Sequence, residues 1–265
     1  MNGARVGRIT ARVGVFALAL GIWQLLSATK VLSTDSFPSM TSTMAELGRQ
    51  VGSALLWSAI AQTLQGWAIG MLIGAGLAIV LGTVLGSSRF AYMSVIPVVE
   101  FLKTVPAIAI LPLVIIVFGA TMEMKIFLVA FAVLWPLTIQ VIYGVRAVDP
   151  LVRDTAKALQ LRGLRRFGTI TMPSAAPFIA TGLRVAAATG LILAVIAELV
   201  GGAQGLGLNI LTAENAGPSA LPMMYAYILV TGVAGVVLTG LLTVLERRLL
   251  HWHESQRNRT SASAI

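Results

Sequence analysis

Six apolar runs, most of them long enough to cross a bilayer, limit what this chain can fold into more than any other feature. They cover residues 13–28, 64–85, 95–118, 124–143, 183–200 and 223–245. A helix needs about 20 apolar residues to span the hydrocarbon core, and the last five runs come close to or exceed that length. Of the 265 residues, 57% are hydrophobic and only 11% are charged, a composition foreign to soluble domains. We therefore predict an all-α, polytopic membrane protein with about six transmembrane helices in a single domain, residues 1–265.

The first run is the shortest, and two interpretations are open for it. It follows Arg5, Arg8 and Arg12, as the apolar part of a secretory signal would. A cleavage site, however, prefers small residues, and the run places the bulky Leu26 where a small one is wanted. We therefore expect this run to be retained as a transmembrane span.

Lysine and arginine gather on one side of the predicted spans. With a cytoplasmic N-terminus, the cytoplasmic segments hold 14 of the 19 basic residues. These are Arg5, Arg8, Arg12, Arg89, Arg146, Arg153, Lys157, Arg162, Arg165, Arg166, Arg247, Arg248, Arg257 and Arg259. Lys30, Arg49 and Lys125 fall on the opposite side. Because cytoplasmic loops are enriched in Lys and Arg, both termini are predicted to be cytoplasmic. Topology explains the net charge of +9, so no nucleic-acid partner is expected.

Small residues recur at four-residue spacing in two of the runs. One row is Gly66, Gly70, Gly74, Ala78, Gly82 and Gly86, and the other is Gly182, Ala186, Gly190 and Ala194. Small side chains let helix backbones approach closely within a bilayer. Since the spacing exceeds 3.6 residues per turn, each row winds around its helix, and we expect it to meet more than one neighbouring helix.

A few polar residues inside the apolar runs are candidates for the pathway or for a subunit interface. Glu198 continues the second row, and a carboxylate within a span is costly, so it is expected to face protein or water, not lipid. The alternative is that Glu198 reaches the headgroups from the end of its span. Glu100 and Lys103 lie three residues apart and are expected to pair on a helix. Gln140 is a further candidate.

Proline interrupts the third and fourth runs. Pro97, Pro106 and Pro112 predict a kinked or broken helix in the third run, and Pro136 predicts the same in the fourth. A broken helix must line protein or a cavity, since its freed backbone groups have no partner in lipid.

The long polar segment between the fourth and fifth runs, about residues 147–180, contains a predicted helix. Asp149 is a good N-cap, Pro150 suits the first helical position, and Gly163 is a plausible stop, so we predict a helix from Pro150 to Arg162. One side carries small or medium residues, which suits insertion into a groove on a partner protein. The alternative is a basic helix lying on the anionic leaflet of the membrane.

In this segment the sequence resembles a known family. Asp154-Thr155-Ala156, followed by Met172-Pro173, is similar to the EAA loop of ABC-importer permeases, whose usual form is Glu-Ala-Ala, three residues, Gly and a closing hydrophobic-Pro. Two longer stretches resemble the nitrate/sulfonate/taurine branch of that family. They are VPAIAILPLVIIVFGATMEMKIFLVAFAVLWPLTIQVIYGVRAVDP and PSAAPFIATGLRVAAATGLILAVIAELVGGAQGLG. Asp154 replaces the usual Glu, Thr155 replaces the first Ala, and Gln160 stands where the family has glycine.

The resemblance implies the type I permease fold within an ATP-driven importer of a prokaryotic inner membrane. It implies a second permease copy, expected to form a homodimer, cytoplasmic ATPase subunits and an extracytoplasmic substrate-binding protein. The loop helix would be the coupling helix that docks on the ATPase. The coupling residues carried over are Asp154, Thr155, Ala156, Ala158, Leu159, Gln160, Leu161, Arg162, Gly163 and Pro173. The branch handles taurine and small anions such as nitrate, bicarbonate and alkanesulfonates, while other relatives import pyrimidine or vitamin precursors.

Nothing in the sequence indicates catalysis by this chain. A phosphate-binding GxxxxGK[ST] loop is absent, because glycine precedes none of the lysines, Lys30, Lys103, Lys125 and Lys157. ATP and Mg²⁺ are therefore expected on the partner ATPase, with no cofactor or metal on this chain. His251 and His253 are expected in solvent or among headgroups. The alternative class is a stand-alone channel or secondary carrier, but a carrier would show two related halves or several intramembrane ionisable residues, and the sequence shows neither.

Overall fold

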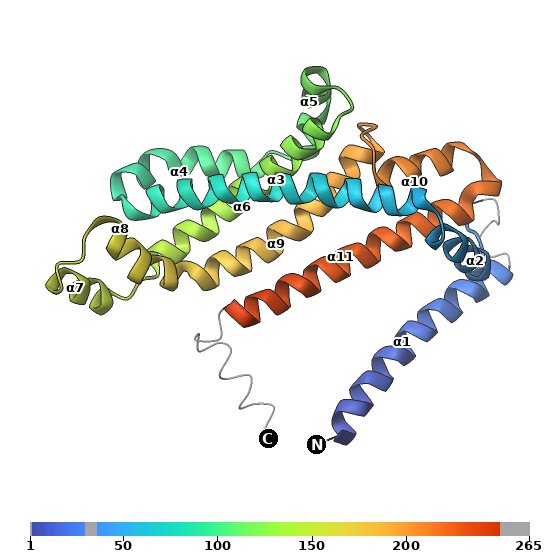
Figure 1. The fold of residues 1–265 in the computed structure, drawn as a ribbon, viewed down its shortest axis with the longest axis horizontal. Coiled ribbons are helices and arrows are strands. Elements are labelled where there is room, and N and C mark those ends of the chain that lie inside the picture. Colours follow the sequence, from blue (N-terminus) through green and yellow to red (C-terminus); the bar gives the residue numbers. More distant parts are fainter. Residues whose placement is uncertain (1, 30–35, 250–265) are drawn as a thin grey trace.

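Helices account for most of the residues that the structure describes (Figure 1). The computed structural model describes residues 2–29 and 36–249, and within these ranges it contains no strand. His251 and His253, together with Arg257 and Arg259, lie outside the described residues. Four helical stretches are long and apolar enough to cross a membrane: Ala54–Ser87, Met122–Arg146, Phe167–Leu199 and Pro218–Arg248. The predicted all-α, polytopic fold is confirmed.

These stretches correspond to four of the predicted spans. They contain α3 (Ala54–Ser87), α6 (Met122–Arg146), α9 (Met172–Leu199) and α11 (Leu221–Leu249). α9 continues a π-helical turn, η2 (Phe167–Thr171), and α11 continues a 3₁₀ turn, η3 (Pro218–Ala220). α3 begins well before the predicted second span because Ser53 caps it, with its side chain accepting from the Leu56 N–H.

Short helices lie at both ends of the long ones (Figure 1). At one end are α2 (Met40–Val51) and α10 (Leu206–Asn215). At the other end are α7 (Pro150–Ala158) and α8 (Gly163–Arg166), which belong to the polar segment between α6 and α9. α7 and α8 of the polar segment therefore lie at one end of the bundle, and α10 lies at the opposite end.

The third apolar run is broken into two helical parts, as the prediction of a kinked or broken helix allowed. α4 (Arg89–Thr104) ends before Pro106, and the chain continues at 82° through η1 (Ala107–Ile110) and α5 (Leu111–Phe118). The break falls at Val105, whose extended backbone (ψ 117°) is what a following proline favours. Of the two outcomes predicted for the fourth run, the broken helix is wrong, because α6 passes through Pro136 without a break. Pro97 is likewise accommodated inside α4.

The first apolar run lies within a longer helix that stands apart from the bundle. α1 (Asn2–Ala28) is attached near its C-terminal end, where the Trp23 indole N–H donates to the Pro38 carbonyl oxygen at 3.0 Å. The Trp23 ring also lies 6.0 Å from that of Tyr225 in α11. Val15 and Leu18, which lie closer to the N-terminal end of α1, are about two-thirds exposed. Figure 1 shows α1 diverging from the other long helices.

The centre of the bundle is α6, held between the two rows of small residues. At Gly66, Gly70, Gly74, Gly82 and Gly86 the space next to α3 is filled by α6 atoms. The atoms nearest to Gly70, Gly82 and Gly86 include Val129, Val141 and Val145, so α3 and α6 run parallel. On the other side, Gly182 of α9 meets Leu137 and Gly190 meets Val129 and Val133, so α9 is antiparallel to α6.

The α3 row thus follows one neighbour along its length, contrary to the expectation that it would meet several. The reason lies on α6, where Lys125, Val129, Val133, Leu137, Val141 and Val145 also recur every four residues. Two rows with the same repeat wind together, so the contact persists over the whole helix. Glycine on one helix and valine on the other give close backbone approach with dense packing, which is what drives association in lipid.

We expect Gly82→Ala to destabilise the protein, because the new Cβ would lie 2.5 Å from the Cβ of Val141 and 2.8 Å from the carbonyl oxygen of Thr138. Overpacking of this kind costs about 1–3 kcal/mol. The matched control is Gly76→Ala on the same helix, where nothing lies within 4 Å. The check is the thermal melting temperature of each purified variant. Equal melting temperatures for the two variants would contradict the packing described here.

Candidate functional site

The polar segment after α6 begins with a side-chain cap, as predicted. Asp149 Oδ1 accepts a hydrogen bond from the Leu151 N–H at 2.8 Å, and Pro150 occupies the first position of α7. The cap satisfies one of the backbone donors that a helix leaves free at its start, and proline there lacks such a donor. The sequence therefore fixes where this helix begins.

The end of α7 differs from the prediction. The helix stops at Ala158, four residues before the predicted Arg162. Gln160 takes a left-handed backbone (φ 54°), and the Leu161 N–H donates to the Ala156 carbonyl oxygen at 2.9 Å. This bond joins the sixth residue of the turn to the first and closes a Schellman motif. The left-handed position of that motif is usually glycine. The position at which the EAA pattern has glycine is thus the turn itself, and Gly163 (φ 53°) comes after it.

α7 presents an apolar surface outward. Leu151 and Leu159 are 74% and 67% exposed, and Thr155 and Ala158 are exposed as well. Ala156 faces the opposite way and is fully buried. Asp154 and Arg162 are also exposed, and Leu161 is half-buried. Leu151 and Leu159 thus give an outward apolar surface to a segment that buries Ala156, and such a surface suits docking in a groove.

The remainder of the polar segment joins α7 to the long helices. α8 and the π-helical turn η2 lead directly into α9, with Pro173 in its first turn. A cavity of about 280 Å³ lies between this segment and the ends of α3 and α6, and its lining includes Gly86, Val145, Arg166 and Phe167. The polar segment is therefore joined to α9 through the chain and faces the ends of α3 and α6 across this cavity.

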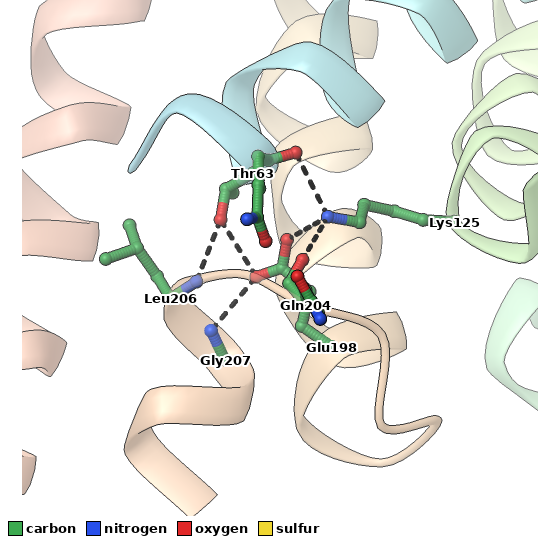
Figure 2. A network of polar contacts seen from close by, with 7 residues as sticks. Thr63, Lys125, Glu198, Gln204, Leu206 and Gly207 are labelled. Carbon is green, nitrogen blue, oxygen red and sulfur yellow. Dashed lines mark hydrogen bonds and ion pairs between the residues drawn. The ribbon is translucent and has the colours of Figure 1, made fainter. Parts of the chain in front are cut away.

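A second polar site lies inside the bundle, toward the end that carries α10 (Figure 2). Lys125 of α6 and Glu198 of α9 are both fully buried, and Lys125 Nζ lies 2.6 Å from Glu198 Oε1. The other carboxylate oxygen, Oε2, accepts from the Thr63 hydroxyl of α3 and from the Gly207 N–H of α10, each at 2.9 Å. We call Thr63, Lys125 and Glu198 the Lys125–Glu198 cluster.

Every donor and acceptor of this cluster that the structure describes has a partner. Lys125 Nζ also donates to the carbonyl oxygens of Gln62 at 3.1 Å and Gln204 at 2.7 Å, which uses all three of its protons. Removing one partner of a buried ion pair leaves an uncompensated charge and costs roughly 3–5 kcal/mol. Glu198 therefore faces protein, as the sequence analysis required, and does not reach for headgroups.

The other polar candidates are placed at separate points. Glu100 and Lys103 form the predicted pair on α4, at 2.8 Å and partly exposed. Gln140 of α6 packs against Gly182 of α9. These side chains do not join the Lys125–Glu198 cluster.

Sequence reasoning missed Lys125, which it assigned to the side opposite the cytoplasm. Lys125 lies at the start of the four-residue row on α6, as Glu198 lies at the end of the row on α9. Each residue thus continues the row of its own helix, and the match between the two rows is the signal that would have paired them. Thr63, three residues before Gly66, was also missed.

Comparisons with known proteins give a matching family, several relatives and a solved structure of similar fold. The family described as binding-protein-dependent transport system inner membrane component matches residues 74–251. SsuC of Bacillus subtilis (strain 168), named for the transport of aliphatic sulfonates, is 29% identical over 90% of this chain and 86% of its own length. The nitrate import permease protein NrtB of Leptolyngbya laminosa is 29% identical over 94% of this chain and 91% of its own. Among solved structures, a chain of the MetNI methionine ABC transporter superposes with a TM-score of 0.63 at 18% identity, covering 74% of this chain and 95% of its own.

Substitution at Gln160 tests the turn that ends α7. A side chain in the left-handed region costs roughly 1–2 kcal/mol relative to glycine, and a β-branched one fits there worst. We expect Gln160→Gly to slow, and Gln160→Val to accelerate, hydrogen exchange of the Leu161 amide that closes the turn. Amides within α6 serve as the internal reference. The same exchange rate in both variants would show that this turn does not form.

Proposed function

The chain belongs to the binding-protein-dependent transport system inner membrane component family, and from this membership we propose that it forms the translocation pathway of an importer. Relatives named for sulfonates and nitrate favour a small anionic solute. It is a multi-pass permease subunit of an ABC importer, and the chemistry of ATP hydrolysis belongs to a partner. We place α7 and α8 on the cytoplasmic side with both termini, because the basic residues gather there.

The observation that carries the coupling role is the outward apolar surface of α7. Leu151, Ala158 and Leu159 are exposed on a helix that lies between two membrane-length helices. We assign this surface to a groove on the cytoplasmic ATPase, with one ATPase subunit for each of two permease copies. The buried Ala156 on the other side keeps α7 attached to its own chain.

Coupling then follows from differential binding. ATP stabilises one arrangement of the ATPase pair, and a helix docked on each ATPase is carried with it. Because α7 continues through α8 and η2 into α9, the displacement reaches the central helices α6 and α9. An extracytoplasmic binding protein delivers the solute at the other end of the bundle.

The double substitution Ala158→Glu/Leu159→Glu tests the docking role. Two carboxylates on the apolar surface of α7 would be desolvated without partners in the groove, which is strongly unfavourable. We expect at least a tenfold loss of the ATPase that co-purifies with the affinity-tagged chain. The control is Gly168→Glu, an exposed position on the following turn where an added Cβ meets nothing within 4 Å. Undiminished co-purification of the ATPase with the double variant would remove α7 from the interface.

The nature of the solute is inferred from the relatives. SsuC and NrtB are named for aliphatic sulfonates and nitrate, which are both small anions. We propose a solute of this class, such as an alkanesulfonate, taurine, nitrate or bicarbonate. The net charge of +9 contributes nothing to this assignment, because topology already explains it.

Growth of a deletion strain tests the solute class. Without this permease, the source organism is expected to lose growth on one nutrient of the set, either taurine or another alkanesulfonate as the only sulfur source or nitrate as the only nitrogen source. Restoring the gene on a plasmid is the control for secondary mutations. Bicarbonate is tested by growth at low carbon dioxide. Normal growth under all of these conditions would contradict an anionic solute.

A further inference from the structure

The turn between α9 and α10 is shaped around Glu198. Gly205 has a backbone (φ 153°) that side chains rarely allow, and a Cβ there would fall 2.1 Å from the carboxylate carbon of Glu198. At Gly207 a Cβ would fall 2.4 Å from the carbonyl oxygen of Val195 in α9. α10 therefore starts in direct contact with the last turns of α9, because Gly205 and Gly207 place no side chain of their own against Glu198 and Val195.

The start of α10 is capped by residues from other helices. Its first two backbone donors, at Leu206 and Gly207, bond to the Thr63 hydroxyl and to the Glu198 carboxylate, each at 2.9 Å. A helix start carries a partial positive charge and free N–H groups, so a carboxylate there is favourable. Gly205, the residue at the usual cap position, has no side chain that could do this.

One carboxylate thus balances two positive ends, the Lys125 ammonium and the start of α10. The three residues come from three helices: Lys125 from α6, Glu198 from α9 and Thr63 from α3 (Figure 2). All three protons of Lys125 are used, and both oxygens of Glu198 accept bonds within the chain. Both side chains are fully buried and their charges are paired with each other, so the geometry favours a positioning role for these residues.

We propose that the Lys125–Glu198 cluster locks α10 onto the α3–α6–α9 core, so that α10 moves with the core and not as an independent loop. Thr63, Lys125 and Glu198 act on transport only by holding α10 in position. That effect on transport rests on the proposed function. α10 buries one side, with Leu206, Gly207, Ile210 and Ala213 at helical spacing. Loss of the lock exposes this side.

The absence of cysteine from the sequence permits a direct test. Ala213→Cys places a single thiol on the buried side of α10, where Ala213 is fully buried, and Glu214→Cys places one at the exposed neighbour as the control. Each is reacted with a water-soluble maleimide in lipid nanodiscs, which admit the reagent from both sides. We expect slow labelling at position 213 and fast labelling at position 214 in the otherwise unchanged chain.

Single changes to the ion pair are expected to open α10. In Lys125→Met or Glu198→Gln, labelling at position 213 should rise at least tenfold, while position 214 is unchanged. The combined Lys125→Met/Glu198→Gln variant leaves no unpaired charge and should regain most of the protection. Unchanged protection in both single variants, or a combined variant no better protected than the singles, would overturn the proposal.

Thr63 supplies a milder pair of variants that does not bury an unpaired charge. Thr63→Val keeps the shape and removes the hydroxyl, whereas Thr63→Ser keeps the hydroxyl. Labelling at position 213 should rise several-fold in the valine variant only. Equal labelling in the two would overturn the capping role. Since labelling needs no partner protein, it separates this inference from the proposed function: reduced uptake by Glu198→Gln with position 213 still protected would return Glu198 to the solute pathway.

Discussion

Close backbone approach in lipid is the constraint on which the rest of this structure depends. Helices inside a bilayer gain little by burying apolar side chains against one another, since lipid is equally apolar, and they associate by dense packing and polar contacts. Here the valine-rich row of α6 lies between the glycine and alanine rows of α3 and α9. The polar contacts concentrate where the three rows meet, at Thr63, Lys125 and Glu198. Packing along the helices and the buried ion pair at their end are parts of one arrangement.

This core connects two segments that face opposite ends of the bundle (Figure 1). α7 is tied through α8 and η2 to α9, and α10 is tied by Glu198 to the far end of the same helix. A docked ATPase would act on the first segment and a binding protein near the second. The rigid link between them is therefore α9 with its partner α6. The position of α1, outside this core and attached near Trp23, is consistent with a peripheral role.

The sequence predicted those features that depend on local chemistry. The long apolar runs gave α3, α6, α9 and α11, and Asp149 with Pro150 gave the start of α7. The EAA pattern marked position 160 as a glycine site, and the structure shows a left-handed backbone there. Features set by tertiary packing were out of reach. Of the four prolines in the third and fourth runs, only Pro106 stands at a sharp break, and neighbouring helices decide which prolines are tolerated. Lys125, the partner of Glu198, lies 73 residues away, and only a comparison of the four-residue rows on the two helices points to the pairing.

Photo-crosslinking from Leu159 tests the central claim, that α7 docks on an ATPase, most directly. The chain is produced in intact cells with p-benzoyl-phenylalanine in place of Leu159, and separately in place of Phe90, an exposed residue of α4. Irradiation is predicted to join the Leu159 variant to an ATP-binding subunit, identified by mass spectrometry, and to give no such product from the Phe90 variant. An absence of this adduct from Leu159, or equal amounts from both positions, would contradict the account.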